Sequence, residues 1–321
     1  MKKFAHLFKS QSWTSYALTM LIFYFLICMI ISPAIFIKSS LSGLSAWATS
    51  VLPSVLPFMF FTRVLSSMNC VQTITKPFSG ISQKLFKTPP ISFYVFFMAI
   101  LSGYPVGSKM IADQFLQGKI TQEDAFKMSA FCSTSGPMFI IGAVGIGMFK
   151  NASIGYILFI SHVIGAILNG LLFRNIKIKS KDSDITPAQQ PQNQTKVDLS
   201  EIVLNSTLSI LSVGCIITIF FIVIESLAPI LSFLPENIRF LTEGCIEITK
   251  GCIDLSTLAN VKLATILTSF VISFGGISTV LQSLTMLAKL KMPAKLFVLQ
   301  KFCHAVFSCL ITIALLFFIK I

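Results

Sequence analysis

The chain has 321 residues, of which 54% are hydrophobic and only 12% are charged. A soluble protein of this size carries about twice that share of charged residues, so the composition excludes an ordinary soluble globular fold. The 25 basic residues outnumber the 12 acidic ones, but basic loops are typical of the cytoplasmic side of membrane proteins. No nucleic-acid-binding motif accompanies them, so we expect a lipid bilayer and no nucleic acid as the partner.

The first apolar segment, Ser15–Ile37, runs 23 residues without a charge and follows a basic N-terminal stretch. It is long enough to cross a hydrocarbon core and longer than the apolar part of a cleavable signal peptide. The sequence therefore predicts an uncleaved N-terminal transmembrane helix within residues 1–38, with the N-terminus in the cytoplasm.

Further charge-free runs follow along the chain. They are Ser39–Thr62, Thr88–Ser108, Met128–Phe149, Ala152–Phe173, Ile202–Ile224, Leu263–Ala288 and Phe302–Ile319. The runs at Ala152, Ile202 and Phe302 contain no cluster of turn-forming residues, so each predicts an ordinary spanning helix.

The other runs include three that turn-forming residues interrupt, at Ser102–Ser108, Ser133–Pro137 and Ser273–Gly276. Glycine and proline break helices, and unwound backbone inside a membrane must line a cavity or be buried in protein. Broken segments in corresponding halves point to a transporter's binding site. From these segments we expect substrate contacts from Ser102, Gly103, Tyr104, Pro105, Gly107, Lys109, Ser133, Thr134, Ser135, Gly136, Pro137, Gly275 and Gly276.

Each of these segments also has a plainer interpretation. Small residues at Ser102–Ser108 allow tight helix packing, and the hydroxyls of Ser133–Ser135 can bond to their own helix. Pro105 and Pro137 favour a true break in both cases, because proline has no N–H to continue the helix. Lys109 directly follows the first break and is the best basic candidate to bind an anion.

The two halves of the chain resemble each other. An offset of 158 residues aligns Thr49 with Thr207 and Val55 with Val213, and it brings Ser102–Gly103 near Gly275–Gly276. We therefore divide the chain into residues 39–174, a polar cytoplasmic linker at 175–198, and residues 199–321. The first unit begins outside, after one span, and the second begins inside, at the basic linker. The predicted fold is all-α: a polytopic membrane protein with inverted repeats that contain broken helices or re-entrant hairpins.

Several elements resemble a known family. Leu52–Phe58, Ser102–Lys109, Ser135–Gly142 and Glu247–Gly251 are similar to the LFPSLFPF, SGYPxGAK, SGPLFIIG and E[IM]TxG elements of the sporulation integral membrane protein YlbJ family. The resemblance implies a nucleoside-recognition, or Gate-domain, protein that shares the plan of concentrative nucleoside transporters. Members in spore formers are associated with moving dipicolinate. The chain departs from the family pattern at Ser133–Thr134 and Lys250, where the family usually has Asn.

The resemblance also selects Glu247 and Thr249 as substrate-binding residues. The stretch around them carries further charges, so a solvated amphipathic segment is the alternative interpretation. His162 matches a Ser–His pair of the family, and His304 lies in the last apolar run. For both histidines we expect structural hydrogen bonding rather than a proton relay.

These observations lead to a transporter of a small polar or anionic aromatic solute, nucleoside-like or dipicolinate-like, in a bacterial cell membrane. The coupling ion, a proton or sodium, stays open, as does assembly with a second copy or a membrane partner protein. The alternative function is a membrane scaffold that moves nothing. We expect no enzyme, because HExxH, GxSxG and GxxxxGK[ST] are absent from the sequence. No cofactor or metal site is expected, and the cysteines are interpreted as core residues.

Overall fold

The computed structural model describes residues 13–67, 73, 75–177 and 199–319, and within these ranges the regular elements are all helical. In the part of the chain that the structure describes, five helices are long and apolar enough to cross a membrane: Pro33–Leu65, Ala152–Phe173, Leu199–Leu231, Val261–Met286 and Ala294–Phe318. A bent pair, Lys76–Phe86 with Ile91–Ser102, adds a sixth if it counts as one span. The chain is thus an all-α, multi-pass membrane protein. Most of the predicted linker, residues 178–198, and the basic residues before Trp13 lie outside the described residues.

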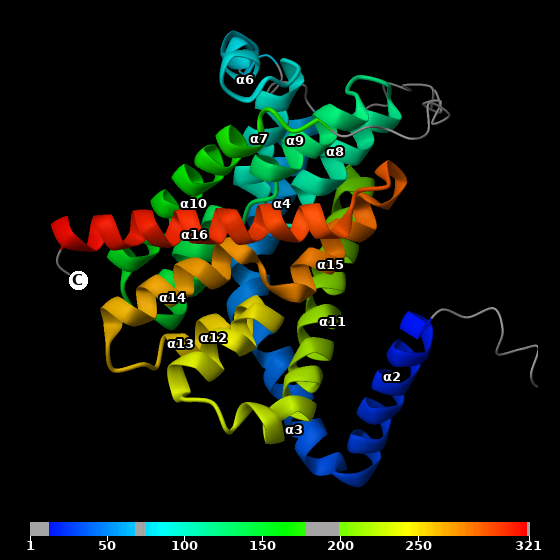
Figure 1. The fold of residues 1–321 in the computed structure, drawn as a ribbon, viewed down its shortest axis with the longest axis vertical. Coiled ribbons are helices and arrows are strands. Elements are labelled where there is room, and N and C mark those ends of the chain that lie inside the picture. Colours follow the sequence, from blue (N-terminus) through cyan, green and yellow to red (C-terminus); the bar gives the residue numbers. More distant parts are fainter. Residues whose placement is uncertain (1–12, 68–72, 74, 178–198, 320–321) are drawn as a thin grey trace, which may run out of the picture.

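The first half begins with α2 (Trp13–Ile31), followed by a long continuous helix made of α3 (Pro33–Ala46), η1 (Trp47–Val51) and α4 (Leu52–Ser67). The helix expected over Ser15–Ile37 therefore ends at Ile31, and the boundary expected at residue 38 falls inside α3. The reason is Pro33, which has no N–H to continue α2 but suits the first turn of α3. Figure 1 shows α2 leaning away from the rest of the helices. It still contacts them, because the Tyr24 hydroxyl donates to the carbonyl of Ser226 (2.6 Å).

The rest of this half is built from shorter helices. After η2 (Lys76–Phe78) and α6 (Ser79–Phe86) come the elements α7 (Ile91–Ser102), α8 (Val106–Leu116), α9 (Gln122–Cys132), η3 (Met138–Met148) and α10 (Ala152–Phe173). The helices α7 and α8 are separated by the predicted break at Gly103, and α9 and η3 by the one at Ser133–Pro137. The bounds of α10 coincide with the predicted run.

The second half repeats this order. It contains α11 (Leu199–Leu231), α12 (Glu236–Ile246), α13 (Ile248–Leu255), α14 (Val261–Phe274), α15 (Gly276–Met286), η4 (Ala288–Leu290) and α16 (Ala294–Phe318). Each half thus has a long helix, two broken pairs and a final apolar helix. By element order the Gly103 break corresponds to Glu247, and Gly275–Gly276 corresponds to Ser133–Pro137. The expected match of Ser102–Gly103 with Gly275–Gly276 therefore does not agree with the element order, in which the break that corresponds to Gly103, Ile246-Glu247-Ile248, has no pair of small residues.

The long helices of the two halves pack together, α3 against α11, and so do the last helices, α10 against α16. Figure 1 shows α16 lying across the molecule beside α14 and α10. One apolar core surrounds α7, α8 and α9, where the rings of Phe86 and Phe131 stack at 4.2 Å. A second core joins η1, η3, α11 and α14. Both cores hold the broken segments between unbroken helices.

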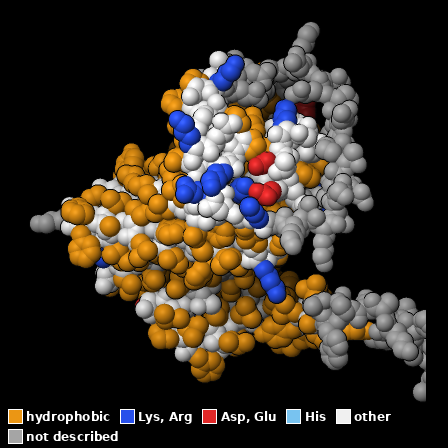
Figure 2. Space-filling model, turned by 45° about the horizontal axis from the view of Figure 1, so that its top comes forward, with side chains coloured by type: hydrophobic (Ala, Val, Ile, Leu, Met, Phe, Trp, Pro, Cys, Tyr) orange, Lys and Arg blue, Asp and Glu red, His pale blue; other side chains and the backbone are white. Residues whose placement is uncertain are grey.

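The outer surface matches a bilayer. Large apolar side chains are exposed along α2, α11 and α16, among them Leu204, Leu208, Phe302 and Phe317. Figure 2 shows a broad hydrophobic surface bordered by a region where Lys and Arg side chains gather. Exposed apolar surface of this extent requires a hydrocarbon solvent, and basic residues favour its polar edge.

Small residues let the two long helices approach closely. The Trp47 indole donates to the carbonyl of Ile210 (3.1 Å), and its ring lies against Gly214, where an added Cβ would come within 2.7 Å of it. A Cβ added to Gly43 would likewise come within 3.0 Å of the backbone of Thr218. Helix packing in membranes depends on such small residues.

We therefore expect Gly214→Ala to lower the thermal unfolding midpoint of the purified protein by several degrees, because overpacking costs about 1–3 kcal/mol. The matched control is Gly80→Ala in α6, where an added Cβ would meet nothing within 4 Å. Its midpoint should stay the same or rise, since alanine favours helix. Equal midpoints for the two variants would contradict the packing described here.

Candidate functional site

The two breaks of the first half cross each other. Helix α7 ends at Ser102, and Gly103 follows with a positive φ of 75°, its N–H donating to the carbonyl of Ala99 (2.9 Å). A Cβ on Gly103 would lie 2.6 Å from the backbone nitrogen of Gly136, inside the second break. Only glycine permits both the backbone conformation and this approach. We call this contact of the Gly103 break with the Ser133–Pro137 break the first crossing.

The breaks of the second half cross in the same way. Gly275, which separates α14 from α15, and Gly276, the first residue of α15, have positive φ values of 89° and 71°. A Cβ on Gly276 would lie 3.1 Å from the backbone nitrogen of Ile248, just after the break at Glu247. We call this contact of the Glu247 break with the Gly275–Gly276 break the second crossing.

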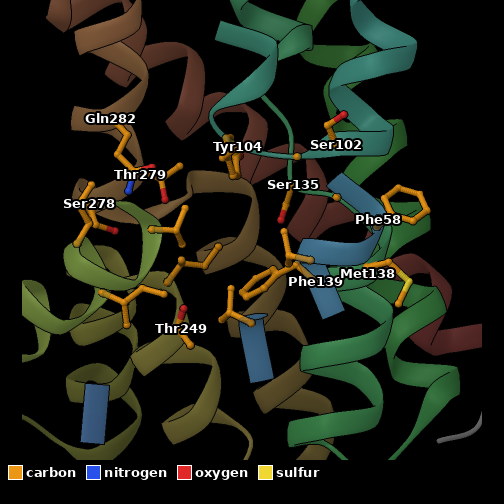
Figure 3. A pocket seen from close by; sticks show the side chains of 18 of the residues that line it. Phe58, Ser102, Tyr104, Ser135, Met138, Phe139, Thr249, Ser278, Thr279 and Gln282 are labelled. Atoms are coloured by element: carbon orange, nitrogen blue, oxygen red, sulfur yellow. The ribbon is translucent and has the colours of Figure 1, made fainter. Parts of the chain in front are cut away.

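A cavity lies between the two crossings and the two long helices. Its polar lining comes from Ser102, Tyr104, Ser135, Glu247, Thr249, Ser278, Thr279 and Gln282, and its apolar lining includes Val55, Phe58, Met138, Phe139, Val213 and Ile216. Figure 3 shows Tyr104, Ser135, Thr249 and Thr279 around the same space, each on a different segment. Among the described residues that line it, Glu247 is the sole charged side chain. The cavity is therefore mainly apolar and aromatic, with hydroxyls, an amide and one carboxylate.

Seven of the predicted site residues line this cavity: Ser102, Gly103, Tyr104, Ser135, Gly136, Glu247 and Thr249. The others do not line it: Pro105, Gly107, Lys109, Ser133, Thr134, Pro137, Gly275 and Gly276. Gly107 instead packs against the carbonyl of Cys132, which an added Cβ would reach at 1.8 Å. Lys109 is exposed on α8, away from the cavity. Gly275 and Gly276 form the second crossing.

Sequence reasoning missed the contribution of α15. Ser278, Thr279 and Gln282 lie within the first two turns after the Gly276 break, at spacings that share one helix face. These residues could have been predicted from their position, since each lies in the first two turns of the helix that follows a predicted break. It also missed Phe58 and Ile216, which line the cavity from α4 and α11 and are related by the same 158-residue offset as Val55 and Val213.

Glu247 is buried, with 1% of its surface exposed, and Thr249 is equally buried. The interpretation as a solvated amphipathic segment is therefore wrong for these two residues. Glu247 begins α13, where its carboxylate accepts a hydrogen bond from the backbone N–H of Lys250 (2.7 Å). The carboxylate thus caps a helix N-terminus, a favourable place for negative charge, while it also lines the cavity.

The charged side chains on either side of Glu247 pair with one another. The Lys250 ammonium pairs with Asp254 and lies 3.4 Å from the Glu243 carboxylate. None of the three residues lines the cavity. Lys250, which stands where the family usually has Asn, is therefore held by two acids of its own hairpin and does not reach the solute space.

His162 holds the first crossing to the second half of the chain. Its Nε2 accepts a hydrogen bond from the backbone N–H of Ser135 (2.9 Å), so this nitrogen carries no proton, and Nδ1–H donates to the Ser273 hydroxyl (2.8 Å). His304 Nε2–H donates in turn to the carbonyl of His162 (2.9 Å). Both rings are at most 1% exposed. These bonds support the predicted structural role of the histidines.

Comparison with curated proteins finds the sporulation integral membrane protein YlbJ of Bacillus subtilis (strain 168), 33% identical over 154 residues. The relative that this comparison finds is the protein whose family the motifs resemble. The match covers 48% of this chain and 38% of YlbJ, so the chain matches well under half the length of that relative. With the apolar helices, the match makes this chain a multi-pass integral membrane protein with a sporulation-related homologue.

The other two comparisons find no relative. No family model matches the chain. No solved structure matches it either.

We expect His162→Leu to destabilise the protein by about 1–3 kcal/mol, because it leaves the buried N–H of Ser135 without an acceptor. His162→Gln should lose less, since its amide oxygen can accept that bond and its NH₂ can donate to Ser273. Thermal unfolding midpoints of the two purified variants, measured beside the unmodified chain, check this. A leucine variant as stable as the glutamine variant would show that the hydrogen bonds of His162 do not stabilise the first crossing.

Proposed function

We propose that this protein is a membrane transporter that moves a small polar aromatic solute through the cavity between the two crossings. The observation that carries the proposal is the position of the cavity, which is enclosed by broken helices from both halves of the chain. Unwound backbone at the interface of two repeats is where secondary transporters bind their solutes. The resemblance to a family with the plan of nucleoside transporters supports the same function.

The lining supports an aromatic, largely uncharged solute. Phe58, Tyr104 and Phe139 offer ring faces and edges for stacking. Glu247 and the hydroxyls of Thr249 and Thr279 can bond to ribose or base donors. A dipicolinate dianion would meet the Glu247 carboxylate, and no basic side chain lies among the described lining residues to offset it. The charge distribution therefore favours a nucleoside-like solute over a dipicolinate-like one, with a proton or sodium gradient as the source of energy.

The alternative function is a scaffold that keeps the transporter plan but moves nothing. One observation favours it: the role of Glu247 as the N-cap of α13 accounts for its burial without any solute. Glu247→Gln distinguishes the two functions, because glutamine keeps an oxygen that can accept the Lys250 N–H and removes only the charge.

We expect the purified protein in liposomes to take up a labelled solute saturably, tested with a nucleoside panel and dipicolinate under a proton or a sodium gradient. Glu247→Gln should lower kcat/KM for that solute by roughly tenfold to a hundredfold, because a hydrogen bond to a charged group contributes about 1.5–3 kcal/mol. The thermal unfolding midpoint of the variant, measured alongside, reports whether the cap survives.

The matched control is Glu236→Gln, the same change of charge at an exposed position in the first turn of α12. Its uptake should equal that of the unmodified protein. If Glu247→Gln takes up the solute as well as the unmodified protein does, the carboxylate does not contribute to solute binding. If no solute enters under either gradient, the scaffold function replaces the transporter.

A further inference from the structure

A buried lysine that belongs to neither the predicted site nor the cavity lining lies at the first crossing. Lys301, in the second turn of α16, is 2% exposed. Its ammonium donates to the carbonyl of Ser133 (2.9 Å) and to the hydroxyl of Tyr104. The same ammonium lies 4.5 Å from the centroid of the Tyr104 ring. Lys301 therefore joins the last helix of the second half to both breaks of the first.

The groups that contact this ammonium carry partial negative charge. Ser133 and Gly103 are the C-cap residues of α9 and α7, so the negative ends of two helix dipoles meet at the first crossing. A carbonyl oxygen and a phenol oxygen complete the surroundings, and both attract cations. The crossing itself thus supplies the partial negative charges that Lys301 contacts.

No acidic side chain takes part. The ion pairs among the described residues are Lys127 with Glu123 and Lys250 with Glu243 and Asp254. The side chains of His162 and His304 interact electrostatically with Lys301, and a histidine ring is either neutral or positive, so neither supplies a negative charge. A buried ammonium without a carboxylate is costly unless dipoles and hydrogen bonds stabilise it, so this lysine needs an explanation beyond packing.

We propose that the Lys301 ammonium is a built-in cation that occupies the position where a transporter of this plan would bind a coupling metal ion. Unwound carbonyls and the C-terminal ends of half-helices are the groups that coordinate such ions, and here they are already bound to Lys301. The first crossing then needs no dissolved sodium to hold its two helix ends together. That the replaced ion would be a coupling ion rests on the proposed function. The presence of a buried cation at the first crossing does not.

The two crossings differ in charge for the same physical reason. At the first crossing the C-terminal carbonyl of α9 contacts Lys301, and at the second the N-terminus of α13 is capped by Glu247. Each crossing carries a charge opposite in sign to the helix ends it meets. With the Lys301 ammonium buried at the first crossing, Glu247 is the charged side chain among the described residues that line the cavity.

The test uses the thermal unfolding midpoint of the full purified chain, so its outcome does not depend on whether any solute is transported. The unmodified protein should show the same midpoint in sodium chloride and in choline chloride at equal ionic strength. A saturable rise with sodium would overturn the proposal, because the crossing would then need a dissolved ion. This measurement needs no variant.

Two substitutions test the ammonium directly. Lys301→Ala should lower the midpoint by at least about 4 °C, and added methylammonium should restore at least half of that loss whereas choline, which is too bulky, should not. Lys301→Met fills most of the same space without a charge, so its midpoint should fall and methylammonium should not restore it. Lys109→Ala removes an exposed lysine of α8 and should show neither effect.

Two results would overturn the built-in cation. One is a methionine variant as stable as the unmodified protein, which would show that Lys301 only fills space. The other is an alanine variant that responds equally to methylammonium and to choline. Either result leaves the proposed transport function standing, since uptake is measured separately.

Discussion

The structure depends on one constraint: backbone N–H and C=O groups inside a bilayer must find partners within the protein. The breaks at the two crossings leave such groups without partners in their own helices. The chain meets the constraint by placing breaks against each other, Gly103 against Gly136 and Gly276 against Ile248. It also supplies side chains from other helices, as when His162 accepts the N–H of Ser135. Each broken helix at a crossing is therefore stabilised by its contact with a second broken helix.

This mutual support explains why the cavity lies where it does. Helices that cross at their breaks cannot fill the space between them, and the two unbroken helices of Val55 and Val213 close its sides. Residues that face the cavity thus come from segments far apart in the sequence. The polar groups left over from the crossings, such as the Ser135 hydroxyl and the Glu247 carboxylate, are the ones available to a solute.

The two buried charged side chains near the cavity each lie at a helix end of opposite partial charge. Lys301 contacts the C-terminal carbonyl of α9, and Glu247 caps the N-terminus of α13. Both side chains are almost completely buried, so their interactions with helix dipoles are weakly screened and correspondingly strong. An uncharged side chain at either place would leave converging carbonyl or N–H groups with less compensation. The same side chains that stabilise the breaks therefore also set the electrostatics around the solute space.

The sequence alone determined the features that depend on local composition. Charge-free runs located α10 and α11, and clusters of glycine, proline and serine located the breaks at Gly103, at Ser133–Pro137 and at Gly275, because apolar length and helix breaking are local properties. The motifs placed Glu247 and Thr249 in the site.

Only the tertiary structure decided which breaks cross and what satisfies them. The pairing of Gly103 with Gly136, the role of Lys301 and the lining from Ser278, Thr279 and Gln282 all join segments more than 30 residues apart or depend on which face of a helix turns inward. From the sequence alone, a lysine in an apolar helix is interpreted as a residue at the membrane edge, because its long side chain can extend to water. Its burial follows from the converging helix ends, which exist only once the chain has folded.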